Sequence, residues 1–266
     1  MKTKSTFCTF LSMLFFSGLI PIIGKNESFA QTYDDIYQKG QKLKSEFKYV
    51  EALAMFQVLL KTDSANTDYL NNTSILFCKA GNLQSDEKKK FDYFRKAEYL
   101  AKKSIRTDST TAESHYAYAL ALGRINENAS SKEKVASAKM IKTQLETTLK
   151  LNPQHAGAYH ILGRWHRTIA GFNAFEKLAI NMMFGGVPQG GSYDDAIAAF
   201  LNAMKYEPKI ILHYYELAVT YEERNSGKED IISAKKYLKI ALDMPSITPD
   251  DPETKRKAEE LLKKLN

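Results

Sequence analysis

The side chains best suited to catalysis or metal binding are scattered along this sequence rather than grouped. Its five histidines do not fall at metal-ligand spacing, and no HExxH or paired CxxC motif occurs. The glycine-rich stretch at 185–191 lacks the Gly-Lys-Ser/Thr ending of a phosphate loop. We read Asp194 and Asp195 as the acidic first turn of a helix, not as a general acid and base. We therefore predict no enzymatic activity, no metal ion and no cofactor.

Aromatic, histidine and arginine side chains instead recur at one position of the expected helices, which suggests binding. Grouped on one face, they could hold an extended peptide, or an anionic head group beside apolar surface. A polar and aromatic groove without a dedicated ligand explains the same residues equally well. The candidate groove residues are Tyr37, Tyr116, His160, Arg164, Arg167 and Tyr215.

A second candidate element lies between two of the expected helices. Phe175, Leu178, Met182 and Met183 share one face of a helix predicted over 173–184. Glycines on both sides would let this helix move as a lid, and methionines adapt to irregular apolar partners. A fixed extra helix packed beside its neighbours gives the same pattern, and we prefer that interpretation.

These residues sit within a helical repeat. Small residues that allow close helix packing recur, for example Gly40 with Ala52, and Leu162-Gly163. The first two units are separated by 34 residues, the tetratricopeptide period, and later units are longer because the loops between paired helices have grown. The expected units begin near Tyr33, Thr67, Ala112, Ala156 and Ile211.

The repeat pattern predicts an all-α fold. We expect a tetratricopeptide-like right-handed α-solenoid of about five helix pairs, with a C-terminal capping helix over 252–265 that is rich in lysine. The first helix of each pair should line the concave face. The single tryptophan, Trp165, is expected to pack between helices.

The first 30 residues are of a different kind. Lys2 and Lys4 precede an apolar run from Phe7 to Ile23, and Ser28-Phe29-Ala30 offers small residues before a cleavage site. That order is typical of a Sec signal peptide, although an uncleaved anchor has a similar composition. We expect residues 31–266 to form the mature repeat domain, exported to the periplasm or secreted, with no stable membrane span.

Charge and cysteine content support a soluble, packed protein. Of the net charge of +7, about +5 remains after cleavage, without a long basic run, which disfavours nucleic-acid binding. Only Cys78 remains, so no internal disulfide can form. Stability must therefore come from helix packing.

The C-terminal half resembles a known family. HILGRW at 160–165, the stretch 175–208, LAVTY at 217–221 and the stretch 234–265 are similar to the regulator of microtubule dynamics family. The resemblance implies a helical-repeat fold and non-enzymatic roles; members are linked to microtubules, and one to phospholipid carriage and tethering. The signal peptide departs from that pattern, indicates an exported bacterial member, and removes the microtubule role.

Two functions follow as hypotheses. The first is a non-catalytic scaffold that binds a protein or peptide partner in its concave groove. The alternative is a carrier of lipid or a small amphiphile, with the 173–184 helix as a cover. If Arg164 and Arg167 contact a peptide, replacing both with Glu should abolish capture without changing thermal stability.

Overall fold

The described part of the chain is a stack of α-helix pairs. The computed structural model describes residues 23–126, 129, 131–184, 186 and 190–266, and no strand occurs among them. The helices are α1 (Ile23–Ser45), α2 (Tyr49–Thr62), α3 (Thr67–Asn82), α4 (Glu87–Thr107), α5 (Ala112–Asn126), α6 (Ser131–Leu151), α7 (Ala156–Gly171), α8 (Ala174–Phe184), α9 (Tyr193–Tyr206), α10 (Ile211–Arg224), α11 (Lys228–Asp243) and α12 (Asp251–Leu265).

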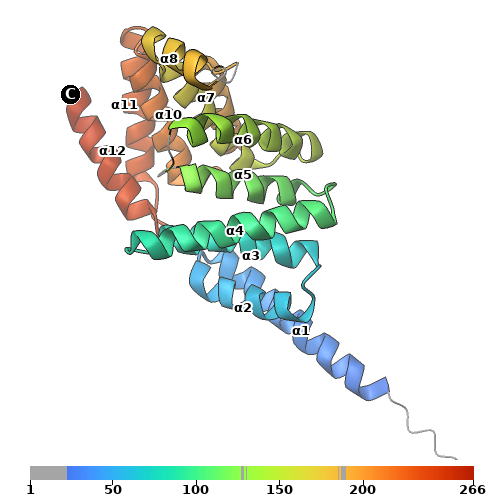
Figure 1. Cartoon of the computed structure of the whole chain (residues 1–266). Coiled ribbons are helices and arrows are strands. Elements are labelled where there is room, and N and C mark those ends of the chain that lie inside the picture. Colours follow the sequence, from blue (N-terminus) through green and yellow to red (C-terminus); the bar gives the residue numbers. More distant parts are fainter. Residues whose placement is uncertain (1–22, 127–128, 130, 185, 187–189) are drawn as a thin grey trace, which may run out of the picture.

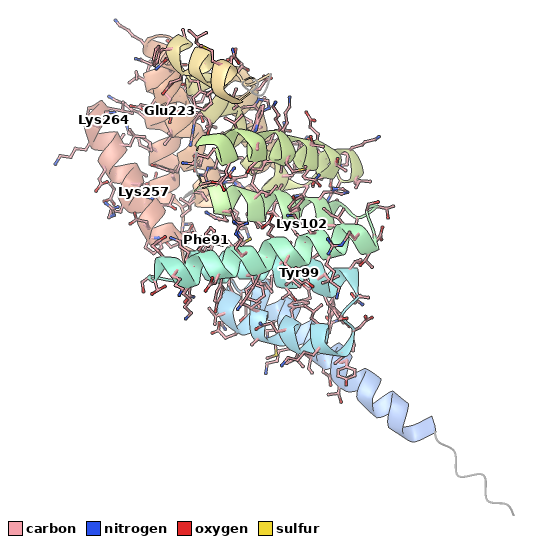
Figure 2. The ribbon with its side chains drawn as sticks, viewed as in Figure 1. Phe91, Tyr99, Lys102, Glu223, Lys257 and Lys264 are labelled. Atoms are coloured by element: carbon pink, nitrogen blue, oxygen red, sulfur yellow. The ribbon has the colours of Figure 1, made fainter. Side chains whose placement is uncertain are left out.

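The pairing of these helices confirms the predicted solenoid. The pairs are α1 with α2, α3 with α4, α5 with α6, α7 with α9, and α10 with α11, and each packs on the next. α12 packs on α10 and α11 and completes the stack (Figure 1). α8 is the inserted helix between the two helices of the fourth pair. On α12, Lys257 and Lys264 are solvent-exposed, as expected of a cap (Figure 2).

Glycine allows the helices of a pair to approach closely. A Cβ atom placed on Gly163 of α7 would lie 2.8 Å from the ring of Phe200 in α9, closer than real Cβ atoms come. Gly40 of α1 is in the same relation to Phe56 of α2, at 2.9 Å. Both phenylalanines are fully buried. The small residues identified in the sequence therefore leave room for aromatic side chains of the second helices, which fill the core.

Two loops are shorter than the sequence suggested. α4 begins at Glu87 and α6 at Ser131, although the sequence pattern indicates starts near Asp92 and Met140. The side chain of Asp86 accepts a hydrogen bond from the Lys89 backbone N–H at 2.7 Å, so it caps α4. Polar residues assigned to insertions are thus the solvent-facing first turns of the second helices, where no apolar stripe marks the helix.

The N-terminal segment is described only in part. Residues 1–22, most of the predicted signal peptide, lie outside the described residues, and α1 begins at Ile23. Within the described ranges, none of the helices combines the length and the apolar character needed to span a bilayer.

Candidate binding cavity

The inner helices enclose a large cavity. Its volume is about 1480 Å³, above the roughly 300–1,000 Å³ usual for small-molecule pockets. Residues of α3, α5, α6, α7 and α10 line it, together with the segment 247–257, which includes the start of α12. The concave face predicted from the repeats is therefore a partly closed chamber rather than an open groove.

The closing segment, residues 247–257, is held by hydrogen bonds near the start of α12. Asn82, at the end of α3, donates a hydrogen bond to the Asp250 carboxylate at 3.1 Å, although 168 residues separate them. Asp251 is buried and accepts hydrogen bonds from the backbone N–H groups of Ile247 and Thr248 at 2.8 and 2.7 Å. The start of α12 consequently lies beside the second helix pair, as Figure 1 shows. This contact connects the second helix pair to the C-terminal cap at the cavity.

A pair of histidines lies at the cavity wall. The Nδ1 atoms of His160 and His213 are 2.9 Å apart, and His213 Nε2 lies 3.5 Å from a Glu207 carboxylate oxygen. Burial, and then the charges of His213 and Arg164, hold the pKa of His160 well below its usual value. His160 is therefore neutral at pH 7, and one Nδ1 donates to the other. The contact with His213 lowers the pKa of Glu207, which keeps that carboxylate charged.

Four of the six predicted groove residues line the cavity. Tyr116, His160, Arg164 and Tyr215 come from α5, α7 and α10 and border the same space. Tyr116 also packs on His155, with ring centroids 4.3 Å apart. The chain thus brings aromatic and cationic side chains from three helix pairs to one chamber.

The other two predicted residues are part of the packing. Arg167, whose side chain is 13% exposed, lies 2.6 Å from a carboxylate oxygen of Glu216 and donates to the Glu216 backbone carbonyl at 3.0 Å. Tyr37 packs edge-on against Phe56 at 5.8 Å and beside Tyr69. Neither borders the cavity. The expectation that Arg167 can be replaced without loss of stability does not fit its ion pair with buried Glu216.

Several cationic residues of the cavity are absent from the predicted groove, and two of them continue a helix register. Lys79 of α3 and Arg124 of α5 both border the chamber. Cys78, directly before Lys79, is buried in the core and does not border the cavity. Each missed residue lies four positions after a lining residue, Ile75 or Leu120. Continuing the i, i+4 spacing, which also relates His160 to Arg164, would have found them.

The predicted lid lies away from the chamber. α8 packs against α6, and its Phe175, Leu178 and Met182 side chains are exposed, by 79%, 55% and 80% respectively, without bordering the cavity. The side chain of Met183 lies outside the described residues. In this arrangement α8 is an extra helix beside the solenoid. Trp165 is buried as predicted, and its Nε1 donates to the Ala138 carbonyl at 2.9 Å.

Comparison with known proteins identifies the family. The sequence pattern of "Regulator of microtubule dynamics protein 1-3" matches residues 29–266. The chain belongs to the regulator of microtubule dynamics family. The match covers the N-terminal repeats as well, so the resemblance is wider than the C-terminal half from which it was first recognised.

Relatives in this family are distant in sequence. Regulator of microtubule dynamics protein 1 of Bos taurus is 28% identical over 180 residues, which is 67% of this chain and 55% of that protein. Protein 3 of Rattus norvegicus is 24% identical over 235 residues, or 87% and 47% of the two chains. The chain thus spans about half the length of these relatives.

A solved structure supports the same fold. The crystal structure of a thermophilic TPR protein of Thermus thermophilus superposes with a TM-score of 0.62, at 16% identity, over 86% of this chain and 98% of that one. At this identity the likeness concerns the fold alone. It confirms the tetratricopeptide-like solenoid that the repeats predicted.

Proposed function

We propose that this protein is a non-catalytic scaffold that binds a short segment of a protein partner inside its cavity. The observation that carries the proposal is the chemistry of the lining, where apolar side chains and charges of both signs share one chamber. A peptide offers the same mixture of apolar side chains, backbone amides and charges. The family and the TPR-like fold support a binding role of this kind.

Charged groups of both signs come to the lining from several helices. Carboxylates come from α5 and α12, for example Glu113 and Glu253, and cations from α3, α5 and α7, for example Lys79, Arg124 and Arg164. A lipid tail would have to desolvate such groups without giving them partners, which costs free energy for each one. A peptide can hydrogen-bond to them. The distribution of charge therefore favours the peptide.

One part of the lining keeps the carrier hypothesis as a second candidate. Val135 and Ile141 of α6, with Trp165, Ile169 and Phe172 at the end of α7, form an apolar end of the cavity. An acyl chain or the apolar side chain of a peptide would be stabilised there by about 25 cal/mol per Å² buried. A carrier would use this end without α8 as a cover, because the exposed face of α8 does not border the space.

Native mass spectrometry combined with lipid extraction tests the proposal. The protein is purified from its own cells as wild type, as Gly123→Trp and as Val50→Trp. Gly123 borders the cavity and a Cβ placed there meets no atom within 4 Å, so we expect the indole to extend into the chamber. Val50 is exposed on α2 and receives the same ring outside the cavity.

We expect a peptide or partner mass on the wild type and on Val50→Trp, and its loss from Gly123→Trp. A stoichiometric lipid that is lost from Gly123→Trp would support the carrier and contradict the peptide proposal. A partner that stays bound to Gly123→Trp would place binding outside the cavity and refute both functions of this chamber.

We further propose that the protein is exported, on the basis of the basic, apolar and small-residue order of residues 1–30. Export with cleavage predicts a mature chain that begins at Gln31. The intact mass of the protein from its own cells tests cleavage directly, and a mass that includes residues 1–30 would contradict cleavage at this site.

A further inference from the structure

Lys79 is a cation of the cavity wall whose ammonium has no ion-pair partner among the described residues. It lies deep in the chamber on α3, and its nearest described interaction is with the Tyr49 ring, whose centroid is 5.8 Å away. No ion pair or hydrogen bond of its ammonium occurs among the described residues. Burial, followed by the charge of Arg124, lowers its pKa, against the opposing effects of Asp250 and Glu207. A cation left without a partner at such a place is costly unless something binds it.

The carboxylates around the cavity do not fill this role, because each has another partner. Glu113 lies 3.3 Å from His155 Nε2, Glu207 lies 3.5 Å from His213 Nε2, and Glu216 lies 2.6 Å from Arg167. The two on the closing segment are engaged as well, Asp250 by Asn82 and Glu253 by Arg256.

Further cationic groups border the same space beside Lys79, namely Arg124 and Arg164, together with the His160–His213 pair. After burial, the contributions that lower the pKa of His160 come from His213, Arg164, Lys79 and Arg124. They come from α3, α5, α7 and α10, so the cationic groups converge from four inner helices. A negatively charged group placed among them would satisfy Lys79 and gain attraction from the two arginines in a water-poor site.

We infer that Lys79 and Arg124 form an anion subsite inside the cavity, which takes a carboxylate of the bound peptide segment. The inference rests on the proposed function and names the chemistry of the ligand. The apolar end formed by Val135, Ile141 and Trp165 then holds an apolar side chain of the same ligand. The carboxylate orients the peptide, and the apolar contact adds buried area.

A pair of dyes isolates the charge effect without knowledge of the natural partner. Anilinonaphthalene sulfonate carries an apolar ring system and a sulfonate, and phenylnaphthylamine is its neutral counterpart. Both fluoresce more strongly in apolar surroundings, so titration of the full-length mature protein gives a Kd for each. Gly123→Trp, which fills the cavity, should abolish the binding of both dyes and so shows that they report on this site.

The decisive variant is Lys79→Gln. We expect it to weaken binding of the sulfonate dye about tenfold or more, as for loss of a hydrogen bond to a charged group, and to leave the neutral dye unchanged. Lys79→Arg should restore the preference for the sulfonate. The matched control is Lys209→Gln, which removes the same charge from an exposed residue at the cavity edge and should change neither Kd. The subsite would be overturned if Lys79→Gln weakened the binding of both dyes equally. It would also be overturned if Lys209→Gln weakened the binding of the sulfonate dye as much as Lys79→Gln does.

Competition against the bound sulfonate dye then identifies the source of the anion. We expect N-acetyl-Leu-Leu with a free carboxylate to displace it at concentrations at least tenfold below those needed by the corresponding amide. Equal displacement by acid and amide would refute the carboxylate subsite while leaving peptide binding intact. Displacement by short-chain phosphatidate, but by neither peptide, would refute the proposed peptide function and the inferred ligand, although Lys79 would still bind an anion.

Discussion

Replacing Arg167 with Met should destabilise the protein strongly, because it leaves Glu216 without its main partner. Both side chains are largely buried, and their charged atoms lie 2.6 Å apart. Breaking a buried ion pair costs about 3–5 kcal/mol. Arg164 Nε, 3.7 Å from the other Glu216 oxygen, retains part of the attraction, so we expect about 3 kcal/mol. For a chain of this size, that corresponds to a fall in Tm of about 6–12 °C.

Arg164→Met is the control, because it removes the same charge one helical turn away. Its side chain is 45% exposed, and an exposed ion pair contributes about 0–1 kcal/mol. Thermal and urea unfolding followed by circular dichroism measure both variants. The double variant Arg167→Met, Glu216→Met should recover much of the loss, since no unpaired charge remains. A loss below about 1 kcal/mol for Arg167→Met, or an equal loss for Arg164→Met, would refute the assignment of Arg167 to packing.

Two further predictions concern stability. Gly163→Ala should lower the unfolding free energy by about 1–3 kcal/mol, because its Cβ meets the Phe200 ring at 2.8 Å. Gly123→Ala, with open space around its Cβ, should raise the unfolding free energy by up to about 1 kcal/mol. Urea unfolding measures both variants, and the opposite order would contradict the packing described. The bond from Arg224 holds the pKa of Asp230 well below its ordinary value. The stability gained from Asp230 is therefore complete above the unfolded pKa of about 4 and is lost as the pH falls towards the folded value. The difference in unfolding free energy between wild type and Asp230→Asn should shrink from pH 6 to pH 3, and a constant difference would contradict the pair.

The fold could be predicted from the sequence because close packing limits the residue types at a few positions. Gly40 and Gly163 must be small to admit the rings of Phe56 and Phe200, and this constraint recurs with each pair. Helix starts were less predictable where the first turn is polar. The first turn of α6, residues 131–134, is entirely polar, so apolar spacing does not mark where this helix begins.

The candidate site was only partly predictable, because lining a cavity depends on which turn of a helix points inward. Arg164 and Arg167 lie three residues apart on α7, yet the first borders the chamber and the second pairs with Glu216. Lys79 borders the chamber four residues after Ile75, yet it is absent from the predicted groove. The closure of the chamber by Asn82 and Asp250 joins residues 168 apart, and no local pattern encodes such a contact.

The central claim, that the partner binds inside the cavity, is tested most directly by photo-crosslinking in the protein's own cells. A benzophenone amino acid replaces Tyr215, which lines the cavity, or Tyr99, which is exposed on α4 (Figure 2) and borders a shallower hollow of about 610 Å³. We expect peptide fragments of one partner to be crosslinked at position 215 and not at position 99. Crosslinks at position 99 alone, or lipid adducts alone at position 215, would contradict the claim.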